Sequence, residues 1–577
     1  MKKKLLPALI VTGLIILVVI IMGITALINK YTPTKKTEDL KEYFNISSDD
    51  EAALIVDNEL SDYKAKIIDK KIYVDYKFVH DSLNSRFYWD ANENVLLYTT
   101  ASDIISAAAD SNSYSVTKQT NDFGYPIVKA TSDSALIALD YVKQYSNITF
   151  KSYDDPARIV ITSKWDEIDS ATVSKSTQVR VRGGIKSPIL KEVKKDDKIT
   201  ILDSGDKWDK VATEDGIIGY IKRKALSESK KTKLTNPDYE EETFTHIKKD
   251  KDICLAWNQV TSQSANSKVP QVISSTKGIN VMSPTWFYLN DNNGNLADIA
   301  SKDYVNYCHS QGIEVWGLFS NLENTDVDAA YVLTHTSTRT TLINQIMSAA
   351  FNYELDGVNI DFENITEAAY GDSYIEFIRE LSIKCHNNGI SLSVDVTVPA
   401  SFNKFFNRSD MAKFADYIVI MGYDEHYKGS DAGSVSSIPW VTEGVESTLK
   451  EVPADQIILG MPFYTRIWEL TPKEDDDAVT DTEDQSKYTV ASQVYSMDAA
   501  AAQLATNNAT AALDEKSGQN YAEWSASNKL YKVWLEDSTS LEKRLKLVDD
   551  NKLAGAAFWK LGFENSSVWD TVIKYLD

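Results

Sequence analysis

The chain has 577 residues, of which 43% are hydrophobic and 25% charged, and its formal net charge is -23. This length exceeds what one compact core supports, so several domains are expected, and the composition excludes wholesale disorder. The strong negative charge excludes a nucleic-acid partner, because phosphate binding requires clustered Lys and Arg. A neutral or weakly charged partner is expected instead.

The N-terminal segment predicts a membrane anchor. Residues 2–4 are lysines, and they precede an uncharged, mainly apolar run over residues 5–28. This run is longer than the roughly 7–15 apolar residues of a signal-peptide core and reaches the roughly 20 that cross a bilayer. We therefore predict one transmembrane helix within residues 1–30 of a protein at the bacterial cell surface, with the large C-terminal part outside the membrane. A cleaved signal peptide is the alternative.

Two small domains are predicted after a linker over residues 31–50. Residues 51–168 alternate short strands and short helices, which predicts an α+β domain. Within it, residues 71–83 resemble the small domain at the N-terminus of copper amine oxidases. No cluster of metal ligands accompanies this pattern, so the resemblance implies no copper chemistry.

The second small domain, over residues 169–228, is predicted to be all-β. Residues 179–182 alternate, a Gly-Gly pair breaks the strand, and residues 216–221 form a final apolar strand. This pattern resembles a bacterial SH3-like domain, which implies contact with the cell wall. A rigid spacer is the alternative, and residues 229–249 predict a second linker.

Residues 250–577 alternate apolar strands with helical patterns, which predicts a (β/α)8 TIM barrel. A doubly wound open sheet is the alternative, but no Gly-rich phosphate turn follows the first strand. An inserted subdomain is predicted over about 471–528. The eight predicted strands are 253–259, 279–289, 314–320, 357–363, 391–398, 417–423, 457–464 and 555–559.

One predicted strand carries two carboxylates and an amide on a single face. Because side chains alternate along a strand, Asn359, Asp361 and Glu363 point to the same side. Apolar residues between them face the covering helices. This arrangement places Glu363 nearest the C-terminal mouth of the barrel, where barrel enzymes hold their catalytic groups.

The spacing of the two acids indicates glycosidic chemistry of a particular kind. Two carboxylates held close together cannot both ionise freely, so a protonated Glu363 can act as a general acid beside an anionic Asp361. Carboxylates two residues apart cannot lie on opposite sides of a sugar ring. The pair therefore favours the route in which the acetamido oxygen of the substrate attacks the anomeric carbon.

The strand is similar to the DGxDxDxE signature of family 18 glycoside hydrolases, the chitinase family, and later strand ends agree. Residues 421–424 resemble the M-x-Y-D motif, 460–466 the G-x-P-x-Y-x-R motif, and 557–559 the last strand. Residues 283–287 further resemble the branch that processes spore or cell-wall peptidoglycan. The resemblance implies that the following residues contact the sugar: Trp286, Tyr423, Asp424, Tyr464, Arg466 and Trp559.

One position departs from the family pattern. Asn359 stands where the family usually has Asp, which can share a proton with the next carboxylate. An amide only hydrogen-bonds, so we expect a more strictly anionic Asp361 and an altered pH profile. Asn359 is counted among the substrate-binding residues, and Glu363 and Asp361 among the catalytic ones.

The sequence therefore predicts a hydrolase that cleaves a glycan containing β-1,4-linked N-acetylglucosamine, such as peptidoglycan or chitin, with retention at the anomeric carbon. No cofactor or metal is expected, because the six histidines show no ligand spacing. The alternatives are a lectin-like protein that binds cell-wall glycan without cleaving it and a membrane-tethered scaffold. The three cysteines are expected to be small buried side chains. Trp257, Trp316, Trp524 and Trp534 are also expected in the core, and Trp286 is the exception among these barrel tryptophans.

Overall fold

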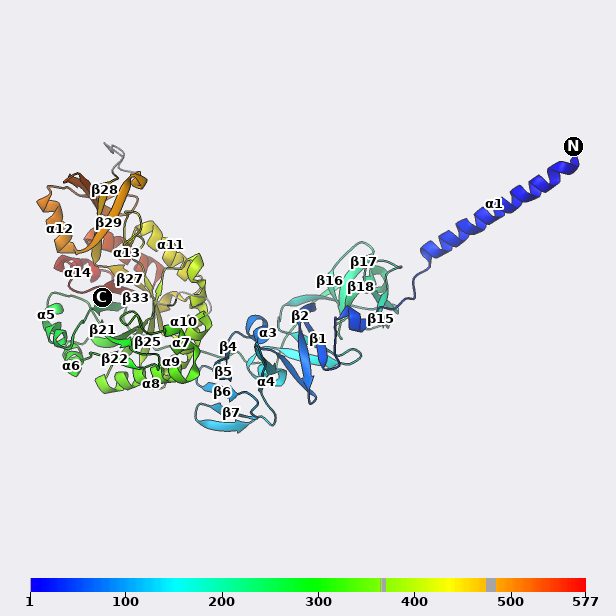
Figure 1. Cartoon of the computed structure of the whole chain (residues 1–577), viewed down its shortest axis with the longest axis horizontal. Coiled ribbons are helices and arrows are strands. Elements are labelled where there is room, and N and C mark those ends of the chain that lie inside the picture. The colour runs from blue at the N-terminus through cyan, green and yellow to red at the C-terminus, as the bar shows by residue number, and fades with distance from the viewer. Residues whose placement is uncertain (1, 364, 366–369, 474–483, 577) are drawn as a thin grey trace. The chain divides into compact units, whose positions relative to one another are not determined.

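The computed structural model describes residues 2–363, 365, 370–473 and 484–576. Two compact units are present, here called the N-terminal unit and the barrel unit (Figure 1). The N-terminal unit comprises Met1–Phe87, Ala107–Tyr114 and Asp122–Glu241. The barrel unit comprises Tyr88–Ser106, Ser115–Asn121 and Glu242–Asp577.

The chain begins with the long helix α1 (Lys2–Tyr31). Its segment Pro7–Tyr31 has a mean hydropathy of 2.9 and is 0% buried. At about 1.5 Å per residue, such a segment is long enough to cross the hydrocarbon core of a bilayer. A signal sequence near the N-terminus has the same length and composition.

Two seven-stranded sheets build the N-terminal unit. In the first sheet, β1 pairs in parallel with β12 and antiparallel with β2. The second sheet is antiparallel, in the region predicted to be all-β. The first sheet has the order β11 (Thr149–Tyr153), β12 (Arg158–Thr162), β1 (Glu51–Val56), β2 (Glu59–Ile68), β3 (Lys71–Asp75), β10 (Ala135–Ala138) and β9 (Val128–Ala130). The second has the order β15 (Ile189–Val193), β14 (Thr177–Arg180), β18 (Ile218–Lys222), β17 (Trp208–Thr213), β16 (Lys198–Asp203), β13 (Glu167–Thr172) and β19 (Lys230–Lys233). The assignment of these sheets to copper amine oxidase-like and SH3-like domains stays a prediction.

A closed parallel barrel forms the barrel unit, as predicted. Each strand pairs in parallel with its two neighbours, and β20 pairs with both β21 and β33, which closes the ring. The strands are β20 (Ile253–Asn258), β21 (Val281–Leu289), β23 (Glu314–Ser320), β24 (Gly357–Asp361), β25 (Ser391–Thr397), β26 (Tyr417–Met421), β27 (Ile457–Pro462) and β33 (Gly555–Trp559). The intervening helices include α6 (Lys302–Ser310), α7 (Ala329–Thr334), α8 (Thr336–Tyr353), α9 (Gly371–His386), α10 (Arg408–Phe414), α11 (Ile438–Thr448) and α13 (Ser538–Asn551).

Two separate layers of apolar side chains surround the strands. One cluster fills the barrel interior and includes Trp257 and Trp316. A larger cluster lies between the strands and the helices and includes Val358, Ile360 and Phe362 of the β24 segment. These three residues therefore face the helices, as the alternation along the strand predicted.

A five-stranded antiparallel sheet is inserted between β27 and β33. This sheet covers the insertion predicted over about 471–528 but extends beyond both of its ends. Its strands β28 and β32, which pair with each other, lie mainly outside that range. Residues 474–483 of the insertion lie outside the described residues. The sheet and its helix are β29 (Tyr488–Ser496), β28 (Tyr464–Pro472), β32 (Lys529–Leu535), β31 (Gln519–Ala526), β30 (Ala512–Asp514) and α12 (Met497–Thr506).

The barrel unit also includes a segment from the predicted α+β domain, which is a correction to the predicted limits of 51–168. Residues 88–106 and 115–121 belong to the barrel unit through buried polar contacts. Tyr88 Oη lies 2.9 Å from Ser373 Oγ, and Thr99 Oγ1 donates to Glu376 Oε1 at 2.9 Å. The segment contributes to the sheet β4 (Phe87–Asp90), β5 (Val95–Thr99), β6 (Ile104–Ala108), β7 (Ser113–Val116) and β8 (Gln119–Asp122).

Candidate active site

Strand β24 delivers the predicted acids to the C-terminal mouth of the barrel. The strand ends at Asp361, and Glu363 follows two residues later with an exposed side chain. At the other end of β24, a Cβ on Gly357 would lie 2.5 Å from ring atoms of Trp316. Only glycine fits there, so the strand packs closely on the indole in the barrel interior.

The Asn359 side chain lies at the centre of a buried hydrogen-bond network. Its Oδ1 accepts from Trp257 Nε1 at 3.0 Å and from Ser283 Oγ at 2.9 Å. Its Nδ2 donates to Ser393 Oγ at 3.0 Å and to Asp395 Oδ1 at 2.7 Å. All of its hydrogen-bonding capacity is therefore used inside the protein, and the predicted direct contact with substrate gains no support from this geometry.

Asp361 and Asp395 form a buried acidic pair beneath the mouth. Burial raises the pKa of Asp361 well above its usual range, and the negative charges of Asp395, Glu363 and Glu323 raise it further. Burial also raises the pKa of Asp395, although the hydrogen bond from Asn359 acts in the opposite direction. Desolvation therefore favours the neutral form of Asp361 in the free protein. That Asn359 makes Asp361 more strictly anionic than an aspartate at that position would stays a prediction.

Asp361 also has an unused hydrogen-bonding atom. Its Oδ1 is buried and has no hydrogen-bond partner among the described residues. A buried polar atom without a partner is costly, so this oxygen is available to a ligand that brings its own donor. An acetamido N–H group is such a donor.

Glu363 has the properties of a general acid. Partial burial raises the pKa of Glu363, and the negative charges of Asp424 and Glu323 raise it further. The group therefore holds its proton at higher pH than an ordinary glutamate. Its exposed position leaves the carboxyl accessible to substrate.

A second polar group lies at the mouth, with Asp424 just after β26 and with Tyr464 and Arg466 on β28, which follows β27. Tyr464 Oη donates to Asp424 Oδ1 at 2.6 Å, and Arg466 Nη2 lies 3.8 Å from the same oxygen. Arg466 Nε is buried without a hydrogen-bond partner in the described part of the chain. Asp424 has a positive φ of 61°, which is uncommon outside glycine and fixes the direction of its side chain.

Aromatic side chains line the same region. The Trp257 ring packs edge-on against Trp559 at 5.9 Å and against Tyr423 at 6.5 Å between ring centroids. Tyr423 packs in turn against Tyr464 at 6.2 Å. Trp559 and Tyr423 are half-buried, so part of each ring is exposed at the mouth, whereas Trp257 belongs to the interior.

The predicted sugar contact of Trp286 is contradicted by the structure. This side chain is 0% exposed and lies in the layer between strands and helices, where its Nε1 donates to Asn266 Oδ1 at 2.8 Å. A fully buried indole presents no face to a ligand. The other tryptophans named as core candidates are Trp257 and Trp316 in the interior, and Trp524 and Trp534 against clusters of the inserted sheet.

Two acidic residues of the site were not found from the sequence. Asp395 lies on β25, whose Ser393 is in register with Asn359, and the alternation of that strand turns Asp395 to the same side. This alternation was the available signal. Glu323 follows β23 and accepts a short hydrogen bond from Ser320, which is in register with Asp361. No motif marks Glu323.

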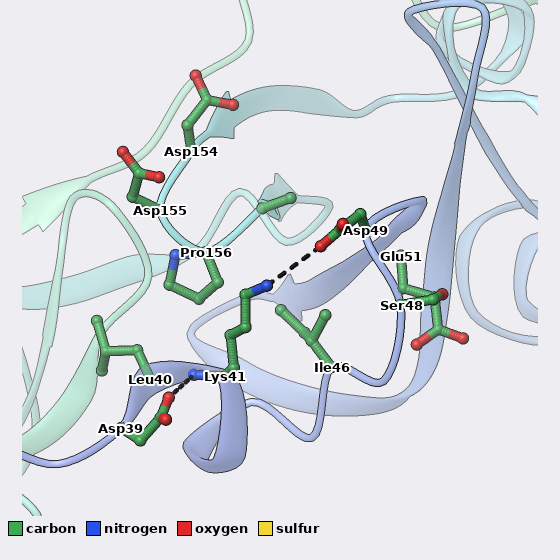
Figure 2. Close-up of a pocket in the computed structure, with 11 residues that line it drawn as sticks. Asp39, Leu40, Lys41, Ile46, Ser48, Asp49, Glu51, Asp154, Asp155 and Pro156 are labelled. Atoms are coloured by element: carbon green, nitrogen blue, oxygen red, sulfur yellow. Dashed lines mark hydrogen bonds and ion pairs between the residues drawn. The ribbon is translucent and has the colours of Figure 1, made fainter.

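The N-terminal unit contains a cavity whose lining residues are far in the sequence from the candidate active site. Figure 2 shows this cavity of about 610 Å3, with Asp154, Asp155 and Asp39 among its lining residues. Asp39 caps the turn at Lys41, and Lys41 pairs with Asp49 at 3.2 Å. In the described part of the chain, no group of three or more His, Cys, Asp and Glu residues is arranged to hold a metal ion. The three cysteines are free and buried.

Comparisons with known proteins agree with this geometry. Residues 325–564 match the family described as Glycosyl hydrolases family 18. An uncharacterized glycosylase of Bacillus subtilis (strain 168), YvbX, is 24% identical over 301 residues, which are 49% of this chain and 81% of that protein. The cortical fragment-lytic enzyme of the same organism is 24% identical over 287 residues, with 48% of this chain and 63% of that protein covered.

Among solved structures, the spore cortex-lytic enzyme SleL of Bacillus cereus has the same barrel fold. Its TM-score is 0.50 at 18% identity, with 60% of this chain and 77% of that chain covered. The family match spans five of the eight barrel strands, from β24 to β33, and contains both predicted catalytic acids. Residues 325–564 therefore match a glycosyl hydrolase family 18 domain, and the chain is an enzyme of the glycoside hydrolase type.

Proposed function

We propose that the chain cleaves β-1,4 bonds in a glycan that contains N-acetylglucosamine, by retaining hydrolysis assisted by the acetamido group of the substrate. One observation carries the proposal: an exposed acid, Glu363, stands two residues after a buried acid, Asp361, which has a free oxygen. The first can reach a leaving oxygen. The second can hold the acetamido group that acts as the nucleophile.

The proposed reaction proceeds in two steps. In the first, Glu363 donates its proton to the glycosidic oxygen while the acetamido oxygen attacks the anomeric carbon, and the bond to the leaving sugar breaks. Asp361 accepts the acetamido N–H, and the proton retained by the acidic pair then resides on Asp395. In the second, the oxygen of a water molecule attacks the anomeric carbon while Glu363 takes a proton from that water. The bond between the anomeric carbon and the acetamido oxygen breaks, which opens the oxazolinium-like ring and restores the original anomeric configuration.

The remaining residues of the mouth are proposed to bind the sugar that holds this acetamido group. Trp559 offers a half-exposed ring for the apolar face of the sugar, and Tyr423 lies beside it. Asp424, held by Tyr464 and Arg466, offers a carboxylate to sugar hydroxyls.

Peptidoglycan or a chitin-like chain is the proposed substrate. The relatives named as cortical fragment-lytic enzymes support a peptidoglycan-type glycan. A relative named as a probable endochitinase supports the chitin alternative. Both polymers present N-acetylglucosamine with a free acetamido group, which is the feature that the mechanism requires.

The test uses the full-length chain in detergent, because residues 88–106 and 115–121 belong to the barrel unit and a fragment that begins after them lacks their contacts. The chain is incubated with N-acetylglucosamine pentamer and, separately, with purified peptidoglycan, and new reducing ends are followed by mass spectrometry. We expect products from one substrate and a loss of more than about 100-fold in Glu363→Gln. The matched control is Glu446→Gln, an exposed glutamate near the C-terminal end of α11. An unchanged rate in Glu363→Gln would remove the mechanism.

We also propose that α1 anchors the chain in the membrane and that the sheet β13–β19 contacts the cell wall. The length and hydropathy of Pro7–Tyr31 support the anchor. A chain that stays in the membrane pellet after alkaline carbonate extraction, and that is digested by protease added outside the cell, has the proposed location. Release into the supernatant contradicts the anchor.

A further inference from the structure

A second cleft of the N-terminal unit lies between its two seven-stranded sheets. Its volume is about 640 Å3, within the range of about 300–1,000 Å3 that is typical of ligand sites. One wall comes from β11 and β12 of the first sheet, and the other comes mainly from β13, β16 and β19 of the second. All of these strands belong to the same compact unit, so the cleft is a feature of that unit alone.

The edges of both sheets border this cleft. β11 is the last strand on one side of the first sheet, and β19 is the last strand on one side of the second. Three consecutive residues of β11, Thr149, Phe150 and Lys151, line the cleft. Because successive side chains point to opposite faces of a strand, this lining places the edge of β11 along the cleft. An edge strand has backbone N–H and C=O groups that no neighbouring strand pairs, so it can hydrogen-bond an extended peptide.

The uncharged side chains of the cleft also suit a peptide. Eight of its twenty lining residues are Ser or Thr, with Thr162 on one wall and Thr200 on the other. A hydroxyl both donates and accepts hydrogen bonds, so these side chains can bond the N–H and the C=O groups of a peptide backbone. The half-buried side chains of Phe150 and Ile168 add apolar surface that small side chains of a peptide can contact.

The charges in the cleft favour a peptide over other polymers of a cell wall. Lys151, Lys198 and Lys230 line it, and none of them forms an ion pair within the described part of the chain. Glu214 and Glu228 line it as well, and they would repel a row of phosphates. A neutral glycan stacks on aromatic faces, but the lining includes a single aromatic ring. A peptide with both carboxylates and an ammonium group can pair with side chains of both signs.

We propose that this cleft binds the peptide stems of peptidoglycan, in an extended conformation along the edges of β11 and β19. These stems are short peptides whose free carboxylates and amino group match the charges of both signs in the cleft. The inference rests on the proposed function, and it gives the proposed wall contact a site and a ligand. Because the cleft and the barrel belong to one chain, binding at the cleft raises the effective concentration of glycan at the barrel.

The test measures binding by isothermal titration calorimetry, with the full-length Glu363→Gln chain in detergent so that no glycan is cleaved. The probes are the stem peptides that an amidase releases from purified peptidoglycan, the glycan strands left after their removal, and poly(glycerol phosphate). We expect the stem peptides to bind, and the added changes Lys198→Glu and Lys230→Glu to raise their Kd about tenfold. The control adds Lys194→Glu and Lys195→Glu instead. These two exposed lysines precede β16 and do not line the cleft, so the Kd stays within about twofold.

The outcomes separate this inference from the proposed function. Stem peptides that do not bind, or that bind equally well after Lys198→Glu and Lys230→Glu, overturn the inference. If these two lysines instead govern the binding of poly(glycerol phosphate) or of the peptide-free strands, the cleft takes a different polymer and the inference is also overturned. Cleavage of N-acetylglucosamine pentamer, which contains no peptide, tests the proposed function by itself. A wild-type chain that cleaves the pentamer but does not bind stem peptides refutes the inference alone.

Discussion

Two clusters of buried carboxylates lie in the same barrel unit, and their surroundings differ. On α8, α9 and α10, Glu376, Glu380 and Asp410 are paired with arginines. Arg339 Nε donates to Glu380 Oε1 at 2.8 Å, and Arg379 donates to Glu376 at 3.0 Å and to Asp410. At the mouth, the charges that act on Asp361 are all negative: Asp395, Glu363 and Glu323.

The pKa values follow this difference. The arginine beside it holds the pKa of Asp410 below its usual range in spite of burial. Burial raises the pKa of Glu380 to about 7, although Arg339 opposes the rise. Burial raises the pKa of Asp361 well above its usual range, with no cation to oppose it. Buried acids paired with cations depend on those cations, whose removal destabilises the fold, whereas buried acids without cations retain a proton that catalysis can use.

The largest effect is expected where a paired cation is removed. In Arg379→Met, Asp410 and Glu376 lose their buried counter-charge, and the free energy of unfolding of the barrel unit falls by about 3–5 kcal/mol. Urea unfolding followed by tryptophan fluorescence measures the change. Lys413→Met is the control: Lys413 Nζ lies 3.4 Å from Asp410 Oδ1, but its side chain is 52% exposed, so about 1 kcal/mol or less is expected. Equal stability of the two variants contradicts the assignment of this cluster to folding.

The difference between the two clusters of acids could be predicted from the sequence only where side chains alternate regularly along the chain. The eight barrel strands and the inward direction of Asn359 and Asp361 followed from alternation along short apolar runs, and the structure confirms the barrel. Register between strands that are distant in sequence is not encoded locally, so the approach of Asp395 to Asn359 was missed. Trp286 shows the opposite error, because a strand motif alone does not say which side chains the helices cover.

The sequence also contained no sign that residues 88–106 and 115–121 contact the barrel. Asp90 accepts from Thr336 N, and Thr99 donates to Glu376, across sequence separations of 246 and 277 residues. Single polar residues in a short hairpin carry no periodic signal that distinguishes a buried partner from solvent. Only the tertiary structure shows that this hairpin is part of the barrel unit.

A smaller effect, on activity and not on stability, is expected when an unpaired acid is neutralised. Asp361→Asn removes the carboxylate that orients the acetamido group, and kcat falls roughly 100- to 1000-fold. No cation is left without a partner, so stability does not decrease. Because the pKa of Asp361 is raised in the folded state, its contribution to stability is fully present below the ordinary aspartate pKa of about 3.9. This contribution is lost as the pH rises through the folded-state pKa of Asp361.

Thermal unfolding at two pH values checks this second part. Because Asn does not titrate, the melting temperature of Asp361→Asn relative to wild type rises from pH 5 to pH 8. A variant that is less stable than wild type at both pH values shows that Asp361 has a stabilising partner. In that case the acids at the mouth stabilise the fold, as the arginine-paired acids do, and the two clusters no longer differ in this respect.

The smallest effect, a change in the pH dependence of the rate, is expected when the exposed Glu323 beside the acids of the mouth is neutralised. Glu363 is active in its protonated form, and the charges of Asp424 and Glu323 raise its pKa. Glu323→Gln removes one of these charges, so the alkaline limb of the rate profile moves to lower pH. Since Glu323 is exposed, 1 M salt reduces the difference. The rate at the optimum stays within about twofold of wild type, and Glu446→Gln leaves the whole profile unchanged. If Glu323→Gln leaves the alkaline limb of the rate profile unchanged, the negative charge of Glu323 does not help Glu363 to keep its proton. Burial alone then raises the pKa of Glu363.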